Sequence, residues 1–318
     1  MTPIVWLPLI VPFLAVHAAR RVAAALEPVR AVQLLTATAV GLAASSSAAL
    51  LLLVIPGASY LPVVAVLGEL AKPLTVGPPS MAVAISVAAA GLLAWRGGAA
   101  VTALRRLRAD LRRARLLVEG GDSELAVLQD GHPDAYALPG KPGRPGRIVV
   151  TTGMLGALDP DEREALFAHE RAHLRGRHHL VLGTAELATL FHPALTTLRE
   201  PLAYALERAA DEAAAEAVGD RRLVGRAIGR AALAGRTAPA PVTRRPLTAL
   251  AAAAGPVPRR VATLLGRTPD SAPRTTGTCR FVAAALLACV ALSGASAIGA
   301  ADSLHRTIEI AQGEYPHD

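Results

Sequence analysis

The sequence contains very few aromatic residues and almost no cysteine. Aromatic side chains make up only 3 % of the chain, so it lacks the ring surfaces on which nucleic-acid binders stack bases. The two cysteines, Cys279 and Cys289, are ten residues apart in one apparent helix, which separates their Cα atoms by about 15 Å. This spacing excludes a disulfide between them, and a Cys-based metal site is excluded as well.

The balance of charge and hydrophobicity points to a membrane protein. Hydrophobic residues make up 52 % of the chain, which exceeds the usual share in soluble proteins. The net charge of +8 is compatible with a nucleic-acid partner, but arginines beside membrane spans give the same total. We therefore expect a lipid bilayer as a partner and no direct contact with nucleic acid.

Four apolar stretches have about the length that a membrane-spanning helix needs, which is about 20 residues. They cover about 3–19, 31–55, 74–95 and 281–301. The first stretch is short and has no basic residue before it, whereas Arg20 and Arg21 follow it. We interpret it as a true span, with a cleaved signal peptide as the alternative.

The distribution of arginine predicts how the spans are oriented, because short loops rich in Lys and Arg stay in the cytoplasm. The loop after the first span carries Arg20, Arg21 and Arg30, and a cluster of arginines between 96 and 115 follows the third span. This cluster also fits an amphipathic helix lying against anionic headgroups. The prediction is a multi-pass protein of the cell membrane with both termini outside.

The polar insert between the third and fourth spans is predicted to be a folded α+β domain. Weak strand signals at 125–128 and 135–138 precede a Pro- and Gly-rich turn and the β-branched run 148–152, so a hairpin is expected. The run 148–152 is also expected to accept an extended substrate as an added strand. The predicted domains are 1–100 with three spans, 101–270 with the polar insert, and 271–318 with a linker, the fourth span and a short outer tail. The linkers 234–248 and 268–278 are expected to be flexible tethers.

A helix is predicted from Asp159, its N-cap, to about Leu174. It carries the pattern H-E-x-x-H at His169, Glu170 and His173. Residues four apart share a helical face, so both imidazoles can reach one zinc ion, with Glu170 placed beside it as general base. A charged surface helix with incidental histidines is the alternative.

Two residues compete for the place of third ligand. His179 has the metzincin spacing H-E-x-x-H-x-x-G-x-x-H, but that family needs a downstream methionine turn, and Met1, Met81 and Met154 all lie upstream. Glu207 and Asp211 lie four residues apart on a second predicted helix, about 200–218. We therefore predict Glu207 as the third ligand and Asp211 as a hydrogen-bond partner of a ligating histidine, with His179 as the fallback.

The segment from Ala135 through Ile148-Val-Val-Thr-Thr to the motif at His169 resembles the gluzincin membrane peptidases of the HtpX and BlaR/MecR groups. The order of three spans, peptidase domain and fourth span resembles BlaR/MecR more closely. The resemblance implies a cytoplasmic protein substrate, such as a winged-helix repressor of the BlaI/MecI type. The chain departs from the BlaR/MecR antibiotic sensors because it has no outer penicillin-binding domain and no S-x-x-K motif in an outer segment.

The prediction is thus a mostly α-helical membrane protein with four spans and a gluzincin-like zinc endopeptidase domain that holds one Zn²⁺. An HtpX-like quality-control protease and a catalytically silent receptor or scaffold of the same fold are the alternatives. A homodimer is compatible with the sequence.

Overall fold

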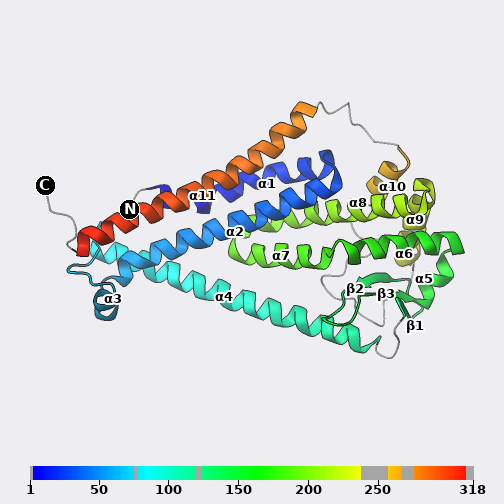
Figure 1. The fold of residues 1–318 in the computed structure, drawn as a ribbon, viewed down its shortest axis with the longest axis horizontal. Helices are drawn as coiled ribbons and strands as arrows, with labels where there is room; N and C mark the ends of the chain where they lie inside the picture. The colour runs from blue at the N-terminus through cyan, green and yellow to red at the C-terminus, as the bar shows by residue number, and fades with distance from the viewer. Residues whose placement is uncertain (1–2, 75–76, 119–122, 238–256, 267–275, 313–318) are drawn as a thin grey trace.

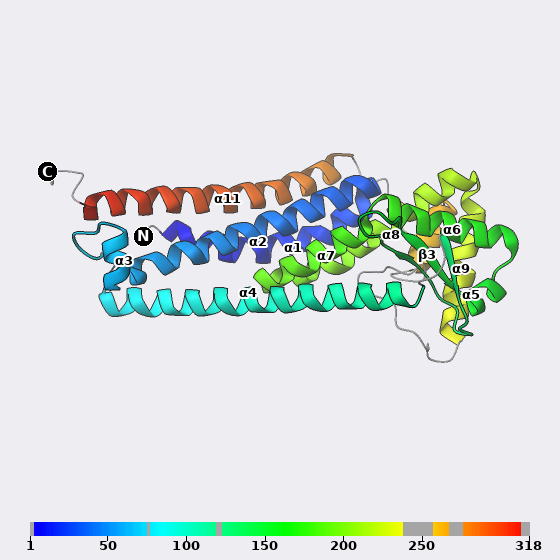
Figure 2. The ribbon, with the colours of Figure 1, turned by 60° about the horizontal axis from the view of Figure 1, so that its bottom comes forward.

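A computed structural model describes residues 3–74, 77–118, 123–237, 257–266 and 276–312. Long helices form an elongated bundle, and a small sheet with shorter helices gathers at one end of it (Figures 1 and 2). The helices of the bundle are α1 (Leu7–Ala25, preceded by the 3-10 turn η1, Pro3–Trp6), α2 (Pro28–Ala58), α3 (Pro62–Leu67), α4 (Pro79–Leu116) and α11 (Thr276–Gln312). The remaining elements are β1 (Leu125–Leu128), β2 (Ala135–Leu138), β3 (Arg147–Thr151), α5 (Thr152–Ala157), α6 (Pro160–Arg175), α7 (His178–Phe191), η2 (Pro193–Leu198), α8 (Arg199–Val218), α9 (Arg221–Thr237) and α10 (Val257–Leu264).

Three helices, α2, α4 and α11, are long and apolar enough to cross a membrane. The first apolar stretch counts as a fourth span if its two parts, Pro3–Ala15 and Ala18–Ala25, are taken together across a bend of 51°. Large apolar side chains are exposed on the outer faces of these helices, among them Leu14, Leu51, Val87 and Ile298. Such surfaces are typical of helices that contact lipid.

The third predicted span is displaced from its expected position. Its helix starts at Pro79 and not at Leu74, because a proline at the first helical turn begins a helix well, and the preceding Gly77 has a φ of 76°. The same helix continues without a break to Leu116. The arginines between 105 and 115 therefore lie on an extension of α4, so the helix expected there is continuous with the third span.

The small sheet has the strand order β1-β3-β2, with β1 parallel and β2 antiparallel to β3. The expected hairpin between β2 and β3 is confirmed. However, β3 is the central strand, since Val149 pairs with Ala126 on one side and with Tyr136 on the other. The prediction that the run 148–152 accepts a substrate strand is therefore wrong, because its backbone groups are already paired.

The helix that carries the motif begins as its sequence predicts. Asp159 accepts a hydrogen bond from the backbone of Glu162, and the Glu162 side chain accepts one from the backbone of Asp159, which is a complete capping box. Pro160 occupies the first turn. The second predicted helix is also confirmed, because α8 covers Arg199–Val218.

A hairpin made of α7, η2 and α8 connects α6 to the bundle. Ala185, Ala188, Leu195 and Leu202 of this hairpin share one hydrophobic cluster with residues of α1 and α2. At its tip, Nε2 of His192 lies 3.0 Å from the carbonyl oxygen of Leu9 in α1. The two helices that carry the candidate site, α6 and α8, are therefore joined through a segment that packs inside the bundle (Figure 2).

Parts of the predicted linkers 234–248 and 268–278 lie outside the described residues. Within the described part, 234–237 belong to α9 and 276–278 to α11. The fourth span is longer than predicted, because α11 extends to Gln312.

Candidate metal centre

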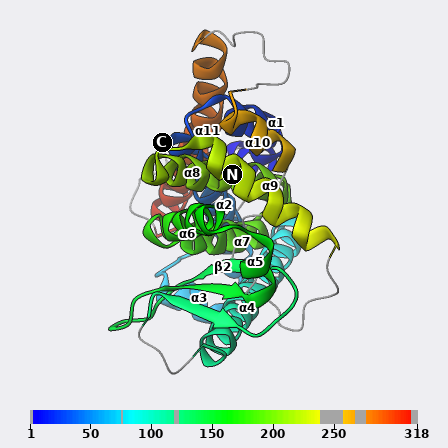
Figure 3. The ribbon, with the colours of Figure 1, turned by 90° about the vertical axis from the view of Figure 1, so that its right-hand side faces the viewer.

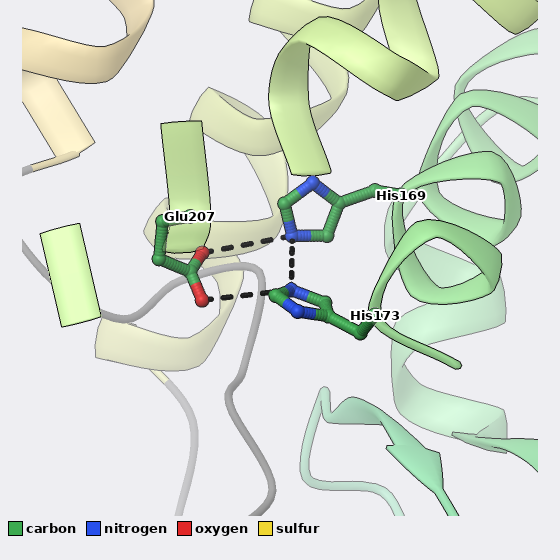
Figure 4. Close-up of side chains that lie close together, drawn as sticks. All are labelled: His169, His173 and Glu207. Carbon is green, nitrogen blue, oxygen red and sulfur yellow. Dashed lines mark hydrogen bonds and ion pairs between the residues drawn. The ribbon is translucent and has the colours of Figure 1, made fainter. Parts of the chain in front are cut away.

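Two neighbouring helices bring together the histidine pair of the motif and a distant glutamate. The helices α6 and α8 lie next to each other (Figure 3). His169 and His173 lie one turn apart on α6, and Glu207 of α8 faces them (Figure 4). Their nearest ligand atoms all lie within 4.8 Å of one another, and all three residues are buried. The structure thus brings together the three residues that the sequence predicts as ligands.

The separations of the donor atoms fit a tetrahedral cation. Nε2 of His169 lies 3.1 Å from Nε2 of His173, and each of these nitrogens lies 3.6 Å from an oxygen of Glu207. Ligands bound tetrahedrally to zinc at about 2.05 Å are themselves separated by about 3.3 Å. Two imidazoles and one carboxylate are also the donor set of a hydrolytic zinc with a free fourth position. The residues therefore fit such an ion.

Glu170 is fully buried beside the three candidate ligands. Burial raises the pKa of its carboxyl to about 7. The charge of His169 lowers this pKa, and the charge of Glu207 raises it by a smaller amount. The backbone of Ala137 in β2 lies near this carboxyl and lowers its pKa slightly. A carboxyl that titrates near neutral pH can both accept and return a proton, which is what a general base requires.

Asp211 holds the first histidine of the motif. Its Oδ1 lies 3.1 Å from Nδ1 of His169, one turn along α8 from Glu207. Burial by itself lowers the pKa of His169, but the hydrogen bonds and charges of Asp211 and Glu207 outweigh it and raise this pKa to about 9. This partnership leaves Nε2 of His169 directed at the candidate ion, as second-shell carboxylates do in other zinc sites.

A buried arginine, which the sequence did not reveal, completes the charge balance. Arg260 of α10 is fully buried, and its Nη1 lies 2.6 Å from Oε2 of Glu207. Its Nη2 and Nε lie 2.6 and 2.8 Å from the two oxygens of Asp211. Burial raises the pKa of Asp211, but the hydrogen bonds from Arg260 and His169 outweigh burial and lower it. Arg260 therefore fixes both acidic side chains of α8.

His178, and not His179, is the further histidine next to the motif. The backbone reverses at Arg177, which has a φ of 49°, so that α7 begins with His178 against the end of α6. Nδ1 of His178 lies 2.6 Å from Nδ1 of His173, and burial lowers the pKa of His178 to about 4. His179 is half-buried near Arg115 and Arg177 and is absent from the group of candidate ligands among the described residues.

Comparison with known proteins agrees with this geometry. Residues 106–198 match the model of Peptidase family M48. The chain carries an M48-type metallopeptidase segment. The match includes His169, Glu170 and His173, whereas Glu207, Asp211 and Arg260 follow it in the chain.

Two curated proteins to which this chain is similar have HtpX in their names. One is "Protease HtpX homolog" from Acidiphilium cryptum, which is 43 % identical over 63 residues, 20 % of this chain and 22 % of that protein. The other is "Protease HtpX homolog 2" from Methanosarcina acetivorans, which is 37 % identical over 62 residues, 20 % of this chain and 21 % of that protein. The chain thus matches about a fifth of the length of these relatives. No solved structure matches it significantly.

Proposed function

We propose that the protein is a membrane-anchored, zinc-dependent endopeptidase of the HtpX-like kind. The observation that carries this proposal is the buried group of His169, His173 and Glu207, with Glu170 beside it. An M48-type segment next to three or four candidate membrane spans supports it further.

Each residue of the site has a distinct role in this proposal. His169, His173 and Glu207 hold one Zn²⁺, which when bound supplies a Lewis acid for the attacking water and the peptide carbonyl. Glu170 accepts the proton of that water and passes it to the leaving amine. Asp211 and His178 orient the two histidines through their second ring nitrogens, and Arg260 holds Glu207 and Asp211 in place.

The substrate is proposed to bind along β2 as an extended strand. β2 is an edge strand of the sheet, and its residue Ala137 lies beside Glu170. Addition of a strand to this edge uses main-chain hydrogen bonds, so it tolerates many sequences. A polypeptide bound there passes Glu170, which lies beside the candidate ligands.

The matched relatives favour an HtpX-like protease over a BlaR/MecR-like signalling protease. The order of three spans, peptidase segment and one span is the feature that favours the second candidate, in which the substrate is a winged-helix repressor. Both candidates place the peptidase segment in the cytoplasm, as the arginines next to α1 and on α4 predict.

The deciding experiment compares the zinc-loaded protein with Glu170→Gln, both purified in detergent or nanodiscs. We expect the wild type to cleave an unfolded protein such as casein, and the variant to keep its zinc but to lose at least about 100-fold in rate. Stoichiometric zinc without any cleavage by the wild type supports the alternative of a silent receptor.

A further inference from the structure

A basic cleft of about 760 Å³ lies around the loop between β2 and β3. It is formed by the end of α4, the residues just before β1, and the loop between β2 and β3. Four cationic side chains line it: Arg115, Lys141, Arg144 and Arg147. The one carboxylate among the lining residues, Glu124, is paired with Arg171, whose Nε lies 2.9 Å from it. The described residues that line the cleft therefore carry a net positive charge.

The loop that carries two of these cations is tightly built. The backbones of Lys141 and Arg144 pair with each other, and Gly143 between them has a φ of 79°, which favours glycine. A Cβ on Gly140 would lie 2.3 Å from the carbonyl oxygen of Arg144. The loop thus holds a fixed shape that other residues at these glycines would disturb.

Two of the cations are held in place by backbone carbonyls. Arg115 donates to the carbonyl oxygens of Pro139 and Gly140, the latter at 2.7 Å, and Arg147 donates to that of Ser123 at 2.8 Å. These bonds use carbonyl oxygens, and among the described residues no carboxylate forms an ion pair with either guanidinium group. Lys141 and Arg144, the other two cations of the cleft, are exposed on the loop between β2 and β3.

The edge strand β2 leads from the metal centre into this cleft. Ala137 lies beside Glu170, and the next residues, Leu138, Pro139 and Gly140, line the cleft. Three residues of extended chain span about 10 Å. The cleft also borders the motif helix, because a Cβ on Gly146 would lie 2.8 Å from Cδ2 of Leu174, the residue after His173.

We infer that this cleft is a subsite for an acidic side chain of the polypeptide substrate, two to four residues from the cleaved bond. The inference rests on the proposed peptidase function. A substrate strand that pairs with β2 runs into the cleft at this distance, and a carboxylate there meets up to four cations. Charge complementarity of this kind selects among substrates more than it adds affinity.

An anionic lipid headgroup has the same charge, but the position of the cleft favours a peptide. Arg115 lies ten residues beyond Arg105 on α4, which moves it about 15 Å further along the helix axis and away from the apolar part of α4. The cleft lies instead among the residues that follow β2, next to the site of cleavage.

The test uses the zinc-loaded, full-length protein and a library of peptides derived from a whole proteome. The variant Lys141→Glu/Arg144→Glu is compared with the matched control Arg222→Glu/Arg236→Glu, which reverses the same charge on the exposed face of α9. Cleavage sites are read by mass spectrometry. We expect Asp and Glu to be enriched two to four residues from the bond cut by the wild type and the control, and this enrichment to vanish in the cleft variant. For a matched pair of peptides with Asp or Asn at that position, kcat/KM should favour Asp by about tenfold only when the cleft is intact.

The outcomes separate the two proposals. Cleavage without acidic enrichment, or enrichment that the cleft variant retains, overturns the subsite. The subsite is also overturned if the cleft variant keeps its cleavage profile and loses activity only in anionic vesicles, because the cleft then binds lipid headgroups. A zinc-loaded wild type that cuts no peptide overturns the peptidase function itself. Zinc content and thermal unfolding of each variant exclude misfolding as the cause.

Discussion

Arg260 and Asp211 form a buried ion pair with two contacts, in which Nε and Nη2 of the guanidinium face the two carboxylate oxygens. The third guanidinium nitrogen faces Glu207. One cation from α10 thus pairs with two carboxylates on successive turns of α8 that also face His169. Asp211 and Glu207 are therefore held before any metal binds.

Removal of this cation should destabilise the metal-free protein strongly. Arg260→Met leaves two buried carboxylates without their cationic partner, which typically costs about 3–5 kcal/mol in the free energy of unfolding. We expect added zinc to recover part of the loss, since it places a new positive charge against Glu207. Thermal unfolding with and without zinc measures both effects. Arg259→Met, a change at the exposed neighbour that stacks on Tyr204, is the control; an equal loss in both variants contradicts the assignment.

Zinc affinity should depend on α8 in a graded way. Glu207→Gln removes a proposed ligand and should abolish stoichiometric zinc, whereas Asp211→Asn alters only the partner of His169 and should weaken binding about 10- to 100-fold. Glu212→Gln, on the same helix but paired with Arg221 at the surface, should change nothing. Equilibrium dialysis against a zinc buffer measures all three. Undiminished zinc in Glu207→Gln contradicts the role of Glu207 as ligand.

The two adjacent histidines after the motif should behave differently. His178→Ala removes the group that contacts Nδ1 of His173 and should weaken zinc binding about tenfold or more. His179→Ala should leave binding unchanged, because this residue is not among the candidate ligands. The reverse result would restore His179 as the ligand that its spacing from His173 suggests.

The metal-free protein should lose stability as the pH rises, in part because of Glu170. Its pKa is raised from 4.5 to about 7 in the folded state, so the folded state binds this proton more tightly than the unfolded state does. The bound proton on Glu170 stabilises the folded state, and this stabilisation is fully present below about pH 4.5 and is lost as the pH rises through about 7. Glu170→Gln removes this loss and should be more stable than the wild type by about 3 kcal/mol above pH 7. The difference should vanish near pH 4, and denaturant unfolding of both proteins at several pH values checks this; a constant difference contradicts the shifted pKa.

The orientation of the bundle can be tested by cysteine labelling in cells. With Cys279 and Cys289 replaced by serine, Lys72→Cys in the loop between α2 and α4 should react with an impermeant maleimide in intact cells. Glu27→Cys between α1 and α2 should react only after permeabilisation, because arginines keep this loop in the cytoplasm. Labelling with the opposite pattern reverses the proposed topology.

The amino-acid sequence alone determined the features that depend on neighbours within a few residues. The capping box at Asp159 and Glu162 set the start of α6, and the four-residue spacing of His169 and His173 placed both rings on one face. The same spacing between Glu207 and Asp211 marked the paired acidic face of α8. Such signals act within one or two helical turns, so they survive without any knowledge of the fold.

Only the tertiary structure decided the features that join segments distant in sequence. Nothing near Arg260 indicates that it is buried, because its partners lie 49 and more residues earlier on another helix. Strand pairing placed β3 in the centre of the sheet and left β2 as the edge beside Glu170, although β3 has the stronger β-branched pattern. A single left-handed residue, Arg177, turned His178 and not His179 toward His173. In each case the outcome depends on how separate elements pack, and local sequence preferences are too weak to determine that packing.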